Sequence, residues 1–441
     1  MHAKSFRSAV STGFLVLAAC VCLGFGSGNA TTSSMEDEEL EGRAPTPVEL
    51  APGVAASFAR ESYAPGAVAR LSILDGHPGL PLQVFRSGPE LGRTRGTNEL
   101  RGVPMTRPRA IGATRAGAAL SVRVGDWPSG LYYGRLTAGG GLAGFAPFVV
   151  RPRRLGGHRV AVVLPTMTWQ AYNLRDDDHD GVGDSWYAAW RHHTVRLGRP
   201  FLNRGVPPCF RRYDLPFLHW LAREGKQVDV LSDAELRTVR TGDVLDRAYD
   251  LIVFPGHHEY VTAHEYDVVE RYRDLGGHLA FLSANNFFWE VVKRGDMIER
   301  TKQWRELGRP ESGLLGVEYR GNDRGGHRAP WIVRHVEATP WLFEGTGLVD
   351  GDPLGNAGIE IDRTAAHSPR GVRVLAEIPD LFGPGFTAQM TYYETPRGAK
   401  VFAAGAFTIA GSAANPVVSR LLANLWTERA GDEGPRSPAG R

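Results

Sequence analysis

The sequence predicts an α/β protein with a doubly wound, mostly parallel sheet, preceded by a smaller all-β sandwich. Two observations predict this division. Between residues 48 and 152, short β-like runs alternate with Gly/Pro turns, and no helix-period segment interrupts them. From residue 153 onward, apolar strands alternate with amphipathic helices, which is the pattern of βαβ units in a parallel sheet. At 441 residues the chain is long enough for two or three domains.

The first 30 residues have the architecture of a secretory signal peptide. Lys4 and Arg7 precede an apolar run from residue 14 to residue 26, which is too short to span a bilayer comfortably. The sequence therefore predicts that the protein is secreted or held at the cell envelope.

Two cleavage sites compete at the end of this leader. Leu-Ala-Ala-Cys, ending at Cys20, has the form of a bacterial lipobox and predicts attachment to the membrane through a lipid on Cys20. Gly28-Asn29-Ala30 offers a small-x-small site for ordinary release instead. Residues 31–47, which follow, are polar and acidic and are predicted to form a disordered tether.

The sandwich is expected over residues 48–152. Its β-like runs recur at the spacing typical of an immunoglobulin-like architecture. They are Val68–Leu74, Leu80–Arg86, Ala118–Val124, Gly130–Leu136 and Ala146–Val150.

The α/β domain is expected over residues 153–430, followed by a disordered tail at 431–441. One helix is closed by Gly225 and another is followed by Gly276-Gly277, as helix C-termini prefer. The expected helices are Leu215–Gly225, Thr262–Leu275 and Asn415–Arg429. The expected strands are His158–Pro165, Val228–Leu231, Leu251–Phe254, His278–Ser283, Trp331–Val336, Val372–Ile378, Ala388–Tyr393 and Lys400–Ala404.

Polar side chains follow three of these strands at their carboxyl ends, where ligands bind in open α/β sheets. The strand Leu251–Phe254 runs into Pro-Gly-His-His-Glu-Tyr, which contains His257 and Glu259. Tyr172 follows the first strand, and Asn285 follows the fourth. Because parallel strands end at the same edge, we expect these four side chains to share one crevice.

Four blocks of the sequence resemble the C-terminal region of the large (β) subunit of N,N-dimethylformamidase, over roughly residues 128–430. The sheet is also similar to class I glutamine amidotransferases, but a Gly-x-Ser-x-Gly or Gly-x-Cys-x-Gly nucleophile elbow is absent. The blocks are Leu164–Asn173, Pro255–Tyr260, Gly276–Trp289 and Tyr392–Gly405.

In the formamidase, two tyrosinates and a glutamate hold one ferric ion that activates water for amide hydrolysis. The resemblance implies that Tyr172, Tyr213 and Glu259 bind Fe(III) here. It also implies that His257 and Asn285 orient water or the substrate carbonyl, with Glu394 at the rim of the pocket. Hard anionic oxygen donors suit Fe(III), and three protein ligands leave positions open for water and an amide oxygen.

A second metal site is predicted in the acidic loop that starts at Asp176. The loop places oxygens at positions 1, 3, 5 and 9 and glycine at position 6, which is EF-hand-like calcium spacing. The predicted Ca²⁺ ligands are Asp176, Asp178, Asp180 and Asp184. Tyr187 stands at position 12 in place of the usual glutamate, and a solvated acidic loop without calcium is the alternative.

The net charge of +3 is small for this length and gives no indication of nucleic-acid binding. The sequence thus favours an exported amidohydrolase that acts on a small-molecule amide through a non-peptide C–N bond, as a monomer or an oligomer. The alternative is a catalytically silent cell-surface protein that binds a ligand or carbohydrate. It would use an aromatic crevice formed by Trp169, Tyr172, Trp186, Tyr187 and Trp289. A zinc site at His257, His258 or His264 is the third possibility.

Overall fold

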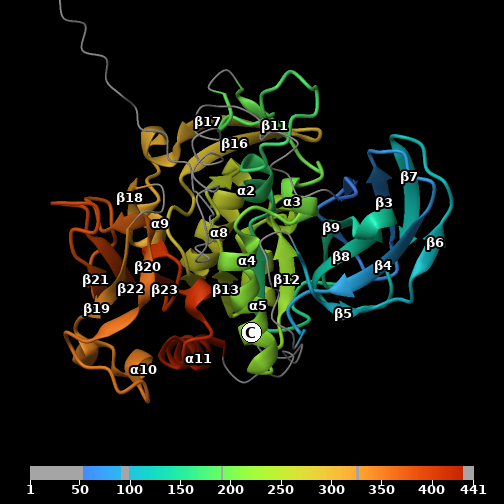
Figure 1. The fold of residues 1–441 in the computed structure, drawn as a ribbon. Coiled ribbons are helices and arrows are strands. Elements are labelled where there is room, and N and C mark those ends of the chain that lie inside the picture. Colours follow the sequence, from blue (N-terminus) through green and yellow to red (C-terminus); the bar gives the residue numbers. More distant parts are fainter. Residues whose placement is uncertain (1–52, 91–98, 190–191, 324–326, 431–441) are drawn as a thin grey trace, which may run out of the picture.

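A computed structural model describes residues 53–90, 99–189, 192–323 and 327–430 (Figure 1). The predicted signal peptide, Cys20, the tether and the C-terminal tail lie outside these ranges. Among the helices in these ranges, none is long and apolar enough to cross a membrane.

Two sheets face each other at the N-terminal end, seen on the right of Figure 1. One has the order β1-β3-β7, and the other has the order β2-β9-β8-β4-β5 with β6 on β4. Both contribute to one apolar core, for example through Leu71 and Phe148. The strands are β1 Ala56–Phe58, β2 Ser62–Tyr63, β3 Val68–Ile73, β4 Leu80–Arg86, β5 Val103–Pro104, β6 Arg109–Ile111, β7 Ala118–Arg123, β8 Gly130–Thr137 and β9 Ala143–Val150. A β-sandwich is therefore present, and its immunoglobulin-like classification stays a prediction.

An 11-stranded mixed sheet forms the centre of the molecule. Its parallel part has the order β12-β10-β13-β15-β23. These strands are β10 Val160–Leu164, β12 Asp229–Ser232, β13 Leu251–Phe254, β15 His278–Phe281 and β23 Lys400–Ala403. They are apolar and buried along almost their whole length, as expected for parallel strands covered on both faces.

The rest of this sheet is antiparallel, so the prediction of a mostly parallel sheet is too simple. The order continues β22-β21-β19-β20-β18, with β24 on β20. These strands are β18 Glu318–Asn322, β19 Arg328–Val333, β20 Pro353–Arg363, β21 Arg373–Ile378, β22 Ala388–Glu394 and β24 Ala406–Phe407. The protein is accordingly a sheet-rich mixed α/β fold, and the likeness to glutamine amidotransferases stays a prediction.

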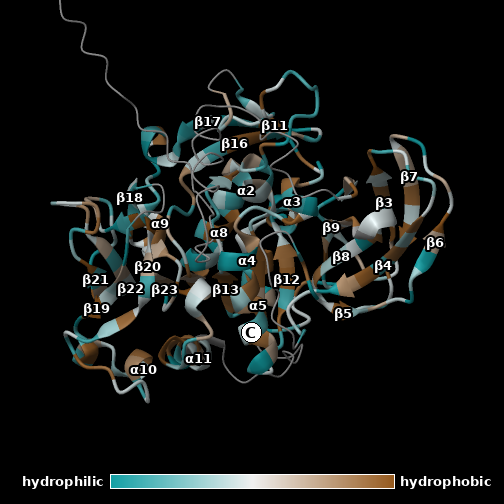
Figure 2. Cartoon of the chain, in the orientation of Figure 1, coloured by the Kyte–Doolittle hydropathy of each residue, from teal (hydrophilic) through white to brown (hydrophobic). Residues whose placement is uncertain are grey.

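Helices cover both faces of the parallel strands. Phe217 and Trp220 of α5, with Leu421 of α11, pack on one face. Val269 and Tyr272 of α8 pack on the other, beside α6 and α7. In Figure 2 the strands between these layers are mostly hydrophobic, whereas the outer surfaces are mostly hydrophilic. The helices are α2 Thr166–Ala171, α3 Leu202–Gly205, α4 Phe210–Tyr213, α5 Leu215–Arg223, α6 Asp233–Thr238, α7 Gly242–Ala248, α8 Ala263–Leu275, α9 Ser312–Leu315, α10 Pro340–Phe343 and α11 Pro416–Ala430.

A small sheet of order β11-β17-β16-β14 lies beyond the carboxyl ends of the parallel strands (Figure 1). Its strands are β11 Thr194–Arg196, β14 Tyr260–Val261, β16 Trp289–Arg294 and β17 Met297–Gln303. Since β14 directly follows Glu259, this sheet holds the segment in which the predicted site residues lie.

Candidate active site

The carboxyl ends of β10, β13 and β15 meet at one edge, and the loops beyond them form a buried polar centre. Helix α2 follows β10 and ends at Ala171, just before Tyr172, while β13 leads to His257 and Glu259. Asn285 follows β15, and its backbone forms a hydrogen bond with His257. The four residues that the sequence predicted to share one crevice are therefore neighbours.

Two phenols hydrogen-bond to the carboxylate of Glu259. Tyr172 donates to Glu259 Oε2 over 2.6 Å, and Tyr187 donates to the same oxygen over 2.8 Å. The two phenol rings stack with their centroids 4.3 Å apart. The hydroxyl of Tyr260 contacts that of Tyr187 and accepts a hydrogen bond from Trp186 Nε1 over 3.0 Å. A continuous chain of hydrogen bonds thus ends on Glu259.

Burial dominates the electrostatics of this centre. Desolvation raises the pKa of Glu259 to about 7, although the phenol hydrogen bonds oppose the rise. Burial and the nearby Glu259 carboxylate raise the pKa of Tyr172 well above 10, and the same causes act on Tyr187. Without a cation, the centre therefore favours protonated oxygens.

His257 lies between two carboxylates. Its Nε2 is 3.5 Å from Glu259 Oε2 and 3.6 Å from Oε2 of Glu360, a fully buried residue of β20. Desolvation lowers the pKa of His257 to about 3, so the imidazole is neutral near pH 7. It can orient a neighbour through hydrogen bonds without carrying charge.

Tyr213, the third predicted ligand, lies on the same side of the sheet as Tyr172. Both pack in one apolar cluster with Ala284, Ile359 and Phe407. The Phe407 ring lies 5.1 Å from Tyr213 and 4.8 Å from His257, measured between centroids. An apolar wall therefore borders the polar centre.

The backbone around this centre is strained at several non-glycine residues. Asn285 and Phe287 have φ values of 51° and 56°, and Ile359 has 71°. A positive φ is a clear outlier for a β-branched residue such as Ile359, and such strain clusters at functional sites. The backbone N–H of Asn285 donates to both oxygens of the Asp362 carboxylate, over 2.9 and 3.1 Å, and this contact holds the turn at Asn285.

Two other sequence-predicted residues lie outside the centre. Glu394 is exposed and pairs in register with Lys400 at the start of β23, which is the opposite edge of the parallel strands. It therefore does not line the pocket rim that was predicted for it. His258 is buried against the Phe254 ring, which belongs to the core on the other face of the sheet.

Glu360 is the main residue that the sequence reasoning missed. Strand β20 was not predicted, and it joins the sheet through irregular pairing near Ile361. The signal that existed is the alternation Ile359-Glu360-Ile361-Asp362, which points both carboxylates to one face of a strand. Both carboxylates are buried at this site.

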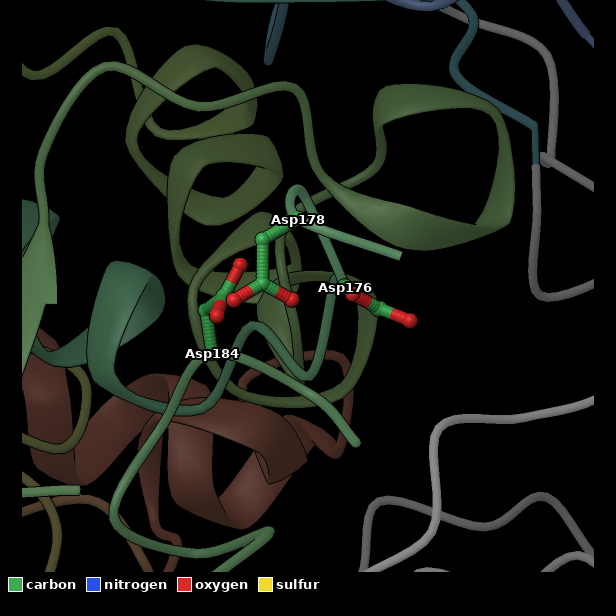
Figure 3. Close-up of side chains that lie close together, drawn as sticks. All are labelled: Asp176, Asp178 and Asp184. Atoms are coloured by element: carbon green, nitrogen blue, oxygen red, sulfur yellow. The ribbon is translucent and has the colours of Figure 1, made fainter. Parts of the chain in front are cut away.

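The predicted calcium loop follows α2 in the chain, and Figure 3 shows the side chains of Asp176, Asp178 and Asp184 close together. One oxygen from each of Asp176, Asp178 and Asp184 lies within 4.8 Å of the others. Asp180 is not in this group, and its carboxylate accepts from the Val182 amide over 2.8 Å. Three of the four predicted ligands are thus together, and calcium binding stays a prediction.

The aromatic residues proposed for a ligand-binding crevice do not form an open surface. Trp169 and Trp186 are buried, and the Arg300 guanidinium lies over the rings of Trp186 and Trp289. The zinc alternative fares no better. His264 Nε2 donates a hydrogen bond to the Val239 carbonyl oxygen over 2.6 Å. Among the described residues, no group of three His, Cys or carboxylate side chains at metal-binding distances includes His257.

A cleft of about 1150 Å³ lies between the sandwich and the central domain. Residues of the β1–β2 loop, α6, the start of α8 and the β16–β17 hairpin line it. None of the proposed ligands is among its lining residues. The cleft and the buried polar centre at Glu259 are therefore separate features of the structure.

Comparison with known proteins points to one family. Residues 117–419 match the family described as N,N-dimethylformamidase beta subunit-like, C-terminal. The N,N-dimethylformamidase beta subunit of Paracoccus aminophilus is 26% identical over 330 residues, which cover 58% of this chain. They cover 42% of that relative, so the chain spans less than half of its length.

Solved structures add nothing to the argument, because the overlaps have very low TM-scores. A superoxide reductase (neelaredoxin) variant from Ignicoccus hospitalis is 11% identical, with a TM-score of 0.16 over 23% of this chain and 82% of its own. The PmoD soluble domain from Methylocystis is 16% identical, with a TM-score of 0.15 over 22% of this chain and 88% of its own.

Proposed function

The chain belongs to the N,N-dimethylformamidase beta subunit-like, C-terminal family, and on that premise we propose that it is a metal-dependent hydrolase of a non-peptide, amide-type C–N bond. Tyr172, Tyr213 and Glu259 would hold Fe(III). The observation that carries the proposal is the buried Glu259 carboxylate, which accepts hydrogen bonds from Tyr172 and Tyr187 beside the neutral His257 imidazole. Tyr213 lies in the adjoining apolar cluster with Tyr172.

The residues present fit a ferric ion. Carboxylate and phenolate oxygens are hard anionic donors, which suit this metal. Burial raises the pKa of Glu259 and Tyr172, and a bound cation reverses that preference by favouring the charged forms. When bound, Fe(III) would supply a Lewis acid that polarises a carbonyl and makes a water molecule more acidic.

The chain's own groups would handle the proton. Hydrolysis requires that water lose a proton as its oxygen bonds to the amide carbon, and that the amine nitrogen gain one as the C–N bond breaks. Glu360 is the base that we assign to the first step, with His257 orienting it across 3.6 Å. The same proton can then pass to the leaving nitrogen, so the products are a carboxylic acid and an amine.

Asn285 is placed to recognise the substrate oxygen. Its side-chain amide is buried and has no hydrogen-bond partner among the described residues. Such a group is costly to leave unsatisfied, and a carbonyl oxygen is a suitable acceptor for its NH₂. Asp362 fixes the backbone of Asn285, so the donor would be held in place before the substrate arrives.

The apolar residues that border the centre favour an amide with alkyl groups. Ala284, Ile359 and Phe407 present an apolar wall that suits alkyl groups on an amide. Tyr172 and Tyr187 are only partly buried, in contrast to Glu259 and His257, so the substrate would enter past these two rings. Export is part of this proposal, with either lipidation of Cys20 or ordinary release after Ala30, and it is supported by the leader sequence.

An activity assay on small amides tests the proposed reaction. The iron-loaded chain is incubated with a panel of N-alkyl formamides and acetamides, and the released amine is measured. Release by the wild type, absent in Glu259→Ala and retained in Glu394→Gln, is the expected result. No release from any amide by a chain that does hold iron would contradict the proposed reaction.

A further inference from the structure

A buried ionic cluster links the sandwich to two of the three chain segments that carry the proposed ligands. It consists of Glu61, Asp233, Arg237 and Glu265, and we refer to it as the anchor cluster. Glu61 belongs to the β1–β2 loop of the sandwich, whereas Asp233 and Arg237 lie on α6 and Glu265 lies on α8. Arg237 pairs with Glu61, and its Nη1 lies 3.6 Å from Glu265 Oε1.

The anchor cluster holds the beginning of α2. Thr166 Oγ1 lies 2.5 Å from Glu61 Oε2 and 3.0 Å from Asp233 Oδ2. The Met167 amide donates to Asp233 Oδ2 over 2.6 Å. Since α2 is only six residues long and ends just before Tyr172, fixing its first turn also fixes the phenol.

The same cluster holds the chain just after Glu259. Glu265 Oε2 accepts hydrogen bonds from the amide and the hydroxyl of Thr262, over 2.7 and 2.8 Å. Thr262 follows the two-residue strand β14, which begins directly after Glu259. The segments bearing two of the three proposed ligands therefore end on one set of charges.

The composition of the cluster makes it sensitive to the loss of any member. Three carboxylates face one guanidinium, and Asp233 and Glu265 are almost completely inaccessible. Removing one partner from a buried charged group leaves the others incompletely compensated, which is far more costly than at the surface. The cluster therefore has one well-defined arrangement, which favours precise placement.

We propose that the anchor cluster, including Glu61 of the sandwich, positions Tyr172 and Glu259 for metal binding. The four members of the anchor cluster are positioning residues, because they act on the metal-binding centre only through α2 and β14. The sandwich would thus be part of the scaffold of the active site. The inference rests on the proposed metal centre and adds the residues that hold it in register.

The test measures the position of α2 separately from the metal. Amide hydrogen exchange is followed in the metal-free full chain, and ferric iron affinity is measured by titration. Thr166→Val keeps the shape of the side chain but removes its hydroxyl, and Glu61→Ala removes the contact from the sandwich. In both variants we expect the amide exchange rates of residues 166–172 to rise about tenfold relative to the exchange rates of the rest of the chain. Iron affinity should fall about tenfold, as for one lost buried hydrogen bond.

Two matched variants separate positioning from general stability. Thr166→Ser restores the hydroxyl and should bring both quantities back to near wild-type values. Ser129→Ala removes a different contact between the sandwich and the central domain, the hydrogen bonds to the Val230 backbone over 3.0 and 2.7 Å. It should leave exchange in α2 and iron affinity unchanged.

The proposal is overturned if Thr166→Val and Glu61→Ala leave exchange in α2 unchanged, or if Ser129→Ala changes it as much as they do. Failure of the proposed function is a different result. In that case the wild type binds no ferric iron, while the exchange data still report whether the cluster holds α2.

Discussion

Two groups of oxygen-bearing side chains, the centre at Glu259 and the loop from Asp176 to Asp184, differ in burial and in charge. The centre at Glu259 is buried, and burial raises the pKa values of its acidic groups. The loop from Asp176 to Asp184 lies nearer the surface: Asp178 is exposed, and Asp176 and Asp184 are partly buried. There, slight burial would raise the pKa of Asp176, but backbone hydrogen bonds from Gly181 and His179 lower it below the ordinary value.

The difference in burial indicates at which of the two places a bound metal would change the protonation of its ligands. The carboxylates of the acidic loop accept hydrogen bonds from the loop's own backbone amides, so leaving the loop without a cation costs little. In the buried centre, loss of solvation raises the pKa values of Glu259 and Tyr172, so a bound cation would be needed to favour their charged forms. The two regions therefore make opposite predictions for mutation, pH and chelation.

Among variants that keep all the proposed metal ligands, Glu360→Gln is expected to cause the largest fall in the rate of amide hydrolysis. This change keeps the shape of the side chain but removes the proposed base, so the rate of amide hydrolysis should fall by about 10²–10⁴-fold. Iron content should not change, because Glu360 is not a proposed ligand. Steady-state kinetics with metal analysis checks both points, with Asp178→Asn as the control in the exposed loop. Wild-type activity in Glu360→Gln would remove this residue from the mechanism.

The next largest effect is the dependence on pH of iron affinity at the Glu259 centre. Tyr172 and Tyr213 must each lose a proton to bind iron, so iron affinity should rise about 100-fold per pH unit above pH 7. Below pH 7 the slope should steepen, because the pKa of Glu259 is raised to about 7 and its carboxylate becomes protonated there. Competitive iron titrations between pH 6 and pH 8.5 measure the slope. A flat profile would mean that protonated phenols do not compete with the metal.

A smaller effect is expected from Tyr187→Phe. It removes one hydrogen bond to Glu259 but no proposed ligand, so iron affinity should fall about tenfold and the visible absorption band should shift. The matched control is Tyr249→Phe, which removes the hydrogen bond from a buried phenol to Asp229 Oδ2 over 3.0 Å at another place in the sheet. Equal losses in both variants would assign the effect to general stability.

The smallest effect is expected from calcium at the exposed loop. This loop leaves Tyr172 and returns to Tyr187, so calcium should stiffen the wall of the centre without altering its ligands. Adding EGTA should lower Tm by about 2–4 °C, the shift expected for about 1 kcal/mol in a domain of 150–250 residues. Asp178→Asn should abolish this response. An unchanged Tm in the wild type would leave the loop as a solvated acidic turn.

The sequence was most informative where local pattern and topology agree. The apolar run Leu251–Phe254 and the polar residues after it follow from strand and turn propensities, and the parallel topology then brings Tyr172 and Asn285 beside Glu259. The predicted bounds of α5 and α8 also differ from the observed ones by no more than two residues.

What the sequence did not show depends on long-range pairing. Glu360 lies in an irregular strand whose partners are distant in the chain, and a glutamate there has no local signal of burial. The prediction for Glu394 was wrong for the opposite reason. It is near matching family residues in the chain, but antiparallel pairing with β23 carries it to the far edge of the sheet. The role of Tyr187 was obscured because it occupies position 12 of the acidic loop.

Iron content and visible absorption of the purified chain, prepared without a histidine tag, show directly whether Tyr172, Tyr213 and Glu259 bind Fe(III). We expect about one ferric ion per chain and a charge-transfer band from the tyrosinates. Both should be lost in Glu259→Ala and kept in Asp178→Asn. A wild type that binds no iron after loading, or a Glu259→Ala variant that binds it as well as the wild type, would contradict the account.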